Sequence, residues 1–293
     1  MMRTYRMQGL IFSVLSLVTV LACLLLPRAD RVAELLFVAV SVVLLGVPHG
    51  ALDALFARRL YGTNTLGLWA AFTLCYLLAA GAVFGVWVLA PTLFLIGFLL
   101  ISVAHFSGDP CAGTLFVSRV LYGGAIIVLP TLLHAVEVSG LFELLAGPHA
   151  AAQVMPVFAT LAGPWLVTLL GCAVLEARRD ISTGAELAAV GLLATIAPPL
   201  VAFGLFFCVM HSARHILRTA VYASDLRPGL LLAVALAPMV LVIGASAAGW
   251  ALLEEVPVAT RITRLLFVGL AALTVPHMLL VERVRFSGWK AAT

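Results

Sequence analysis

Five of the seven histidines in this chain lie inside strongly apolar stretches: His49, His105, His211, His215 and His277. An ionisable side chain inside a membrane segment is costly and usually marks a functional site. Neutral imidazole is a good ligand for iron, copper or zinc, and a metal-bound imidazole is cheaper to bury than a charged one. The pattern therefore favours a metal centre built from histidines.

Two local motifs support such a centre. In the segment His211-Ser212-Ala213-Arg214-His215 the two imidazoles stand at i and i+4, on one face of a helix, where both can bind one ion. Residues 49–53 and 105–109 share the pattern H-x-x-x-D, which in a helix places each aspartate one turn from its histidine. A carboxylate there can accept the imidazole N–H that does not face the metal. We therefore treat four residues as candidates for a further ligand or for a hydrogen-bond partner of a ligand: His277, Asp53, Asp109 and Glu282.

The composition indicates the kind of element that must position these side chains. The chain has 293 residues, of which 63% are hydrophobic and only 10% are charged. Soluble domains are roughly half apolar and about a quarter charged. We predict an all-α, polytopic membrane bundle that forms a single membrane-embedded domain over residues 1–293. The basic residues stand in short clusters between apolar runs, which is typical of orientation signals and gives no reason to expect a nucleic-acid partner.

A spanning helix needs about 20 apolar residues. Division of the chain at proline, glycine and charge clusters predicts about ten spans, although eight or nine also fit because the seventh is short. The predicted spans are 8–26, 33–56, 66–90, 92–107, 115–136, 157–176, 183–197, 199–222, 229–250 and 261–284. The first is interpreted as an uncleaved helix, and residues 138–156 are interpreted as a loop with an interfacial helix.

The distribution of Lys and Arg predicts the orientation. With the N-terminus in the cytoplasm and ten spans, only Arg28, Arg31, Arg261 and Arg264 fall on the outer side, and the rest of the 17 basic residues fall on the inner side. This bias predicts a multi-pass protein of the cell membrane with both termini inside. On that topology all five histidines fall in the inner half of their helices and share one depth, as a single site requires.

The chemistry that fits is dioxygen activation. Four neutral histidines, His49, His105, His211 and His215, suit a borderline metal such as Fe(II) and leave octahedral positions open for O₂. An apolar setting indicates an apolar substrate that arrives from the surrounding lipid. The spacing alone leaves copper or a haem group as alternatives.

The four motifs Pro-His-Gly-Ala-Leu-Asp at 48–53, Ala-His-Phe at 104–106, His-Ser-Ala-Arg-His at 211–215 and Pro-His-Met at 276–278 resemble, in matching order, the bacteriorhodopsin-related-protein (Brp/Blh) family of membrane β-carotene 15,15′-dioxygenases. The resemblance extends from about the second span to the last. It implies Fe(2+)-dependent cleavage of the central double bond of β-carotene by O₂ to give all-trans-retinal. It also implies that His49, His105, His211 and His215 are the iron ligands, and that retinal passes to a rhodopsin or to further metabolism.

Three other functions remain open from the sequence. A bis-histidine haem protein would transfer electrons and would show a Soret band. A non-catalytic carotenoid or retinal carrier would bind the polyene and consume no O₂. A metal transporter would need a polar path through both leaflets, whereas the histidines gather on one side.

Overall fold

The computed structural model describes residues 2–28, 30–225 and 228–286, and within them the regular structure is entirely helical. The first half of the chain contains α1 (Met2–Leu25), α2 (Arg31–Ser41), the π-helical segment η1 (Val42–Gly46), α3 (Val47–Ala51), α4 (Asp53–Tyr61), α5 (Leu66–Leu89), α6 (Pro91–Phe106), α7 (Phe116–Val128) and α8 (Thr131–Ala146). The second half contains α9 (Pro148–Ala177), α10 (Ile181–Ile196), α11 (Pro199–Leu205), the π-helical segment η2 (Phe206–Ser212), α12 (Ala213–Tyr222), α13 (Pro228–Leu252) and α14 (Val258–Phe286).

Among the described residues, seven helices are long and apolar enough to cross a membrane, or eight if the bent pair α7 and α8 forms one span. This confirms a multi-pass membrane protein. The helices α6 and α10, predicted as the fourth and seventh spans, have 16 residues each and are shorter than a full span. The second predicted span lies within Arg31–Tyr61, a single candidate span made of α2, η1, α3 and α4 with a turn at Leu52.

Two predicted boundaries differ from the structure. The predicted span 115–136 is broken, because α7 ends before Pro130 and α8 leaves at an angle of 62°. The predicted loop at 138–156 is wrong, since these residues are helical except at Gly147. Gly147 has a φ of +89°, and Pro148 stands in the first turn of α9, where the missing N–H costs nothing. The Gly-Pro pair thus separates two helices and does not make a loop.

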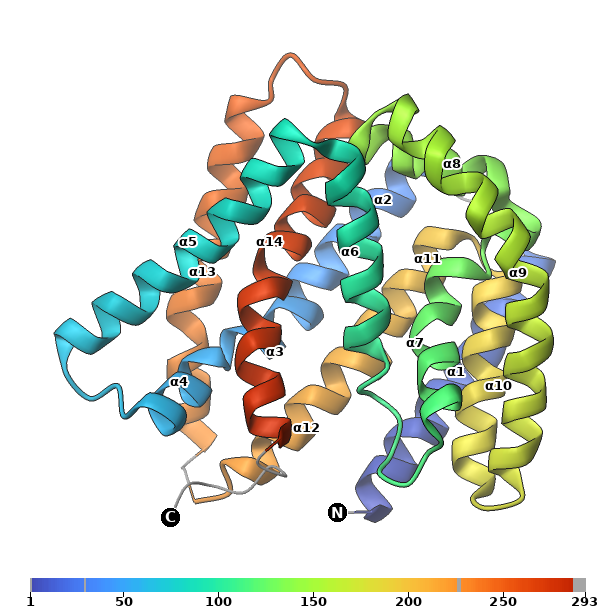
Figure 1. The fold of residues 1–293 in the computed structure, drawn as a ribbon, viewed down its shortest axis with the longest axis horizontal. Coiled ribbons are helices and arrows are strands. Elements are labelled where there is room, and N and C mark those ends of the chain that lie inside the picture. The colour runs from blue at the N-terminus through green and yellow to red at the C-terminus, as the bar shows by residue number, and fades with distance from the viewer. Residues whose placement is uncertain (1, 29, 226–227, 287–293) are drawn as a thin grey trace.

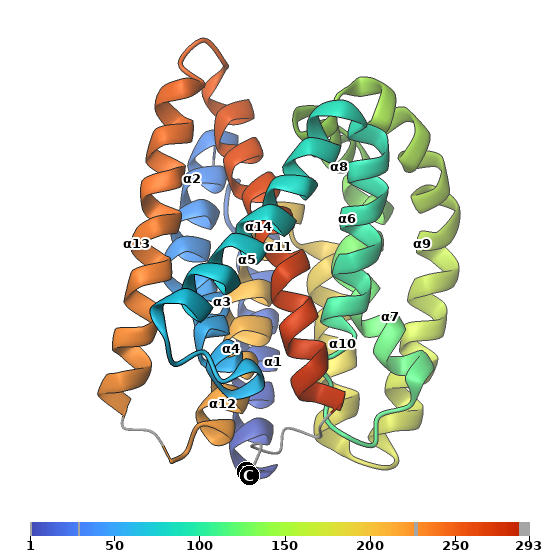
Figure 2. The same cartoon turned by 60° about the vertical axis from the view of Figure 1, so that its left-hand side comes forward.

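The bundle has two sides (Figures 1 and 2). On one side α9 packs against α7, α8 and α10, and α10 packs against α1. On the other side α14 packs against α2, α4 and α5, while α13 packs against α3 and α14. No residue of α5 is buried, and α13 has little buried surface among its described residues, so both lie at the periphery. The two π-helical segments pack against each other between the two sides.

The helix α1 begins and α14 ends at one end of the bundle, whereas α2 and α14 begin at the other end (Figure 1). The four basic residues assigned to the outer side stand at or next to the starts of α2 and α14. Among those assigned to the inner side, Arg227 and Lys290 lie outside the described residues.

Candidate metal centre

All five histidines of the apolar stretches meet at the junction of the two sides. They come from α3 (His49), α6 (His105), η2 (His211), α12 (His215) and α14 (His277). The His49 ring centroid lies 5.1 Å from that of His211, 5.4 Å from that of His215 and 5.2 Å from that of His277. The His105 centroid lies 4.5 Å from that of His211 and 5.3 Å from that of His277. Five imidazoles from distant parts of the chain thus form one cluster, which we call the histidine cluster.

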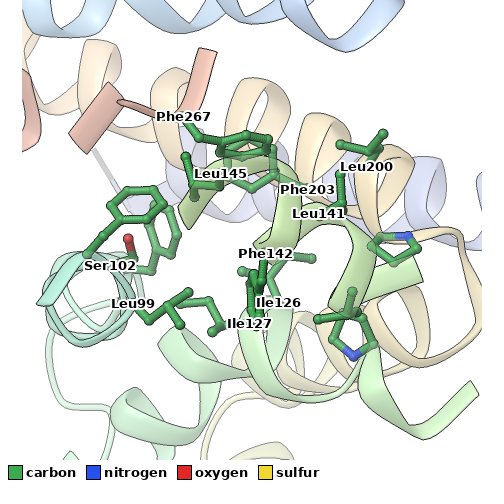
Figure 3. A pocket seen from close by; sticks show the side chains of 15 residues that line it. Leu99, Ser102, Ile126, Ile127, Leu141, Phe142, Leu145, Leu200, Phe203 and Phe267 are labelled. Carbon is green, nitrogen blue, oxygen red and sulfur yellow. The ribbon is translucent and has the colours of Figure 1, made fainter. Parts of the chain in front are cut away.

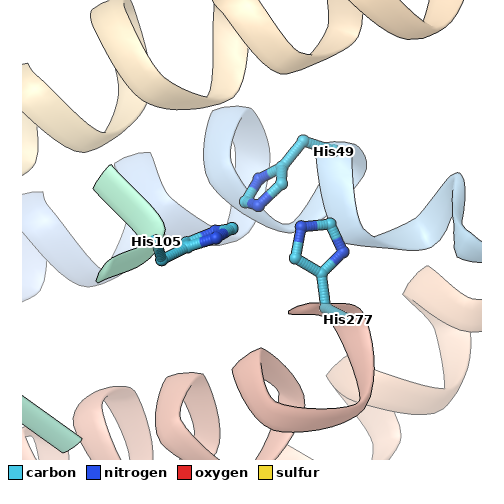
Figure 4. A group of neighbouring side chains, drawn as sticks. All are labelled: His49, His105 and His277. Atoms are coloured by element: carbon cyan, nitrogen blue, oxygen red, sulfur yellow. The ribbon is translucent and has the colours of Figure 1, made fainter. Parts of the chain in front are cut away.

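Three members of this cluster have the spacing of metal ligands. His49, His105 and His277 each offer one nitrogen, and these three atoms lie within 4.8 Å of one another. Figure 4 shows the three rings facing a common point from three different helices. The triad contains two of the four predicted ligands together with His277, and the rings of His211 and His215 adjoin it.

The π-helical segments bring His49 and His211 together. A Cβ on Gly46, in η1, would lie 2.5 Å from a ring carbon of Phe207 in η2, so only glycine permits this approach of the two segments. The widened turn of a π-helix is frequent at functional sites. Gln8 of α1 donates from Nε2 to the carbonyl oxygens of Val209 at 2.8 Å and Met210 at 3.3 Å, and so holds η2 from outside.

A carboxylate orients His277. Asp53 Oδ1 lies 2.7 Å from His277 Nδ1, and the Tyr76 hydroxyl donates to Asp53 Oδ2 at 2.9 Å. The sequence pattern paired Asp53 with His49, one turn away, and the structure differs. The helix is interrupted at Leu52, between α3 and α4, and this turns Asp53 toward α14. His49 instead lies against the Gly46 carbonyl and, at 3.0 Å, the Ser212 hydroxyl through its Nδ1.

A second carboxylate orients His211. The Asp109 oxygens lie 3.0 and 3.1 Å from His211 Nδ1, whereas the sequence pattern paired Asp109 with His105. The helix α6 ends at Phe106, and the following loop carries Asp109 across to η2. Arg218 and Arg214 both donate to the Asp109 backbone carbonyl, at 2.7 and 3.3 Å, which fixes the loop.

The same loop contains Cys111, one of five free cysteines in the described residues. Burial raises the pKa of the Cys111 thiol, which therefore stays uncharged at neutral pH.

Arg214, between the two histidines of the 211–215 motif, is fully buried. Its guanidinium donates to both carboxylate oxygens of Glu186, at 2.8 and 2.9 Å, and its Nε donates to Gln8 Oε1 at 2.8 Å. The charge is therefore paired inside the bundle by residues of α10 and α1. In the sequence, Gln8 and Glu186 stand out only as polar residues within apolar runs. The sequence does not show which helix each side chain would face.

Three residues remain to be placed: the candidate Glu282 and the two histidines outside the apolar stretches. Glu282 is half-buried and stands five residues beyond His277, about 1.4 helical turns, so its side chain leaves α14 on another side. His134, near the other end of the bundle, lies with Nε2 3.0 Å from the Ile196 carbonyl oxygen. His149 is exposed and adjoins Gln153. Neither is one of the five rings of the histidine cluster.

The residues present fit a metal ion. His211 and His277 are each held at Nδ1 by a carboxylate, while their Nε2 atoms are buried and have no hydrogen-bond partner among the described residues. A buried polar atom without a partner is costly and calls for an explanation. Histidine ligands of metals commonly donate one ring N–H to a carboxylate and turn the other nitrogen to the ion. Several rings within about 5 Å of one another also leave little width for a porphyrin between any two of them.

An apolar cavity of about 470 Å³ adjoins the histidine cluster. His49, His105 and His277 line it on one side, and Trp69 and Phe72 of α5 line it on another. Part of α13, from Val234 to Val242, completes the wall. Its volume lies within the range of roughly 300–1,000 Å³ that is usual for small-molecule sites. We call it the histidine cavity.

Comparison with known proteins gives consistent matches. A family model for β-carotene 15,15′-dioxygenase matches residues 40–284. A β-carotene 15,15′-dioxygenase from uncultured marine bacterium 66A03 is 31% identical over 252 residues, which cover 82% of this chain and 90% of that protein. A probable β-carotene 15,15′-dioxygenase, Blh, from Halobacterium salinarum is 29% identical over 217 residues, 65% of this chain and 63% of that protein. No solved structure matches the chain significantly.

Proposed function

The chain belongs to the β-carotene 15,15′-dioxygenase family, whose members cleave β-carotene to retinal, and we propose that the histidine cluster holds the iron on which this reaction depends. One O₂ and one β-carotene give two molecules of all-trans-retinal, with one oxygen atom in each new aldehyde. The enzyme is thus a carotenoid dioxygenase, as the motifs predicted.

The metal assignment rests on one observation. In two of the histidines a carboxylate holds one ring nitrogen, while the other ring nitrogen has no hydrogen-bond partner among the described residues. Asp53 and Asp109 accept the Nδ1 protons of His277 and His211, which leaves each Nε2 lone pair facing the cluster. We propose His49, His105, His211 and His215 as ligands of Fe(II), with His277 as a fifth ligand or as a close neighbour of the ion. A ferrous ion bound here supplies the redox chemistry that couples O₂ to the polyene.

The protein itself orients the histidine rings and keeps water away from them. Asp53 and Asp109 fix the tautomer and direction of two imidazoles, and Tyr76 fixes Asp53. Phe207 stacks on His211 with ring centroids 5.5 Å apart, and Phe106 meets the same ring edge-on at 4.9 Å. These apolar faces exclude water from the cluster. The mechanism requires no general base from a side chain.

The histidine cavity provides the binding surface for the polyene. It is bounded by α5 and α13, two peripheral helices that offer a lateral route from lipid to the histidines. An extended hydrocarbon held along this wall has its reacting carbons close to the cluster, and such positioning is a major part of catalysis.

We further propose the cell membrane as the location, with both termini in the cytoplasm and the histidine cluster in the inner half of the bilayer. The distribution of basic residues supports this orientation. Retinal is apolar enough to leave through the lipid, and a rhodopsin in the same membrane is a suitable recipient.

The direct test is aerobic incubation of the detergent-solubilised protein with β-carotene, with and without an iron chelator, followed by detection of retinal. We expect retinal only when iron is retained. Replacement His211→Ala should abolish both bound iron and retinal formation. Retention of both by this variant would contradict the ligand assignment, and a Soret band in the purified protein would favour a haem group.

A further inference from the structure

A second apolar cavity, of about 330 Å³, continues from the histidine cavity between α2, α13 and α14. Four residues line both cavities: Val47, Val242, Leu270 and Leu273. Figure 2 shows α13, α2 and α14 side by side in this region. We call this space the distal cavity. The shared lining makes it an extension of the reaction site.

The two cavities follow one another along α13. Residues from Val234 to Val242 line the histidine cavity, and residues from Val242 to Trp250 line the distal cavity. Each stretch corresponds to about 12 Å of helix, so that together they extend over roughly 24 Å. Helix α14 gives the same order in the opposite chain direction, with His277 on the histidine cavity and Ile262 at the far end of the distal cavity.

The far end of the distal cavity is built from a fixed aromatic ring. The guanidinium of Arg261 lies over the Trp250 ring, 4.5 Å from its centroid. Arg261 is buried, and it donates to the carbonyl oxygens of Glu254 and Val256 in the loop before α14. The loop thus holds Arg261, and the Trp250 ring that packs on it marks the far end of the cavity.

A third cavity, on the other side of Phe207, does not offer this continuity. Figure 3 shows the side chains that line it. It has a volume of only about 100 Å³, and none of its described lining residues lines the histidine cavity. Phe203 lines this small cavity and stacks against Phe207, which lines the histidine cavity, at a centroid distance of 5.3 Å. The two rings form a wall between the two spaces.

We infer that the distal cavity binds one half of the carotenoid, while the aromatic end of the histidine cavity, at Trp69 and Phe72, binds the other half. The inference rests on the proposed function, because cleavage of a central double bond leaves half of the substrate on each side of the reacting carbons. The ligand class of the distal cavity is the apolar ring and polyene arm of a carotenoid. Its lining suits this class, since Ser246 is the only hydroxyl-bearing residue among the described residues that line it.

Gly269 offers a way to fill the distal cavity from within. It lines the cavity, and a Cβ added there would meet no atom within 4 Å. A larger side chain at this position can therefore leave the backbone without a clash at Cβ, and phenylalanine would occupy part of the cavity. Gly171 is the matched control, because it lies exposed on α9, a Cβ there also meets nothing, and it lines none of these three cavities.

The experiment compares Gly269→Phe, Gly171→Phe and the unchanged protein on two substrates. One is β-carotene, and the other is a β-apocarotenal shortened on one side but retaining the central double bond. We expect Gly269→Phe to lower kcat/KM for β-carotene by about tenfold or more and to keep that for the apocarotenal within about threefold. The control should cleave both substrates normally, and all three proteins should retain their iron and thermal stability.

A second substitution in the opposite wall, Ser246→Phe, keeps the inference falsifiable if Gly269→Phe fails to fold. Normal cleavage of β-carotene by the folded variants would overturn the inference, because the substrate would then not need the distal cavity. Equal loss of both substrates with iron retained would also overturn the inference. Failure of the unchanged protein on both substrates would count against the proposed function itself.

Discussion

The Asp53 carboxylate holds the imidazole of His277 although 224 positions separate the two residues, with 2.7 Å between Oδ1 and Nδ1. Both side chains are buried, and Tyr76 donates to the second carboxylate oxygen. This chain of hydrogen bonds runs from α5 through α4 to α14. It ties the tautomer of one imidazole to the packing of three helices, so that the direction of His277 is set before any metal binds.

Replacement Asp53→Asn should weaken iron binding. The amide keeps the shape of the carboxylate but removes the charge that strengthens the His277 imidazole as a donor to a metal. Loss of such a partner costs about 10–100-fold in metal affinity or activity. The measurements are iron content after dialysis against a weak chelator and the rate of retinal formation. Asp225→Asn is the control, because Asp225 is exposed and its carboxylate pairs with Arg59 and not with a histidine. Equal iron content in the two variants would contradict a role for Asp53.

Loss of one member of the Arg214–Glu186 pair should destabilise the fold more than loss of both members. Both side chains are buried, and loss of one partner leaves the other charge unpaired. We expect Glu186→Gln to lower the free energy of unfolding by about 3–5 kcal/mol. The double replacement Arg214→Met/Glu186→Met should recover part of this loss. Thermal unfolding in detergent measures both effects.

The exposed pair Arg28–Glu137 provides the comparison for that measurement. Arg28 is 47% exposed, and such pairs contribute about 0–1 kcal/mol. Glu137→Gln should therefore change the unfolding temperature only slightly, because Arg28 keeps Glu34 as a second partner. A similar destabilisation by Glu137→Gln and Glu186→Gln would mean that burial of the Arg214–Glu186 pair has no special effect.

The convergence of the five histidines could be predicted because hydropathy places the helices and residue number places each histidine along its helix. The partners of the carboxylates could not. The pattern H-x-x-x-D assumes an unbroken helix, yet the chain is interrupted at Leu52 and leaves the helix after Phe106. Each interruption redirects an aspartate from its neighbour in sequence to a histidine on a distant helix.

The π-helical segments could not be predicted from the sequence either. A widened turn has no composition of its own, and η2 depends on contacts with Gln8 and, through Phe207, with Gly46. Some helix boundaries were predicted wrongly because prolines were used to divide the chain into spans. Pro156 and Pro164 lie inside α9, as membrane helices tolerate, whereas Pro130 marks a true bend.

Removal of the metal should destabilise the folded protein. An ion that binds only the folded state stabilises it by RT ln(1 + [L]/Kd), about 2.7 kcal/mol at a hundredfold excess over Kd. Chelation should therefore lower the unfolding temperature and abolish retinal formation, and added Fe(II) should restore both. Zn(II) should restore stability but no activity, because it has no redox chemistry. In His211→Ala the chelator should have little effect on the unfolding temperature. An equal effect in both proteins would place the bound metal elsewhere.

Gln8 should position the histidine cluster from a helix that precedes the matched family region, which begins at residue 40. Its amide donates to the carbonyl oxygens of Val209 and Met210 in η2 and accepts from Arg214. Gln8→Leu keeps the volume but leaves a buried carbonyl and a guanidinium N–H unsatisfied, at a cost of about 1–3 kcal/mol each. We expect slower retinal formation and weaker iron binding, because η2 carries His211.

Gln8→Glu separates the two contacts, since a carboxylate still accepts from Arg214 but offers no donor to Val209. If activity depends mainly on the hydrogen bonds from Gln8 to η2, Gln8→Glu should lose activity and iron affinity as Gln8→Leu does. It should nevertheless unfold at a higher temperature than Gln8→Leu. Met7→Leu, at the exposed neighbouring position, is the control and should behave like the unchanged protein. Normal iron affinity and activity in both Gln8 variants would show that α1 supports the bundle without positioning the metal ligands.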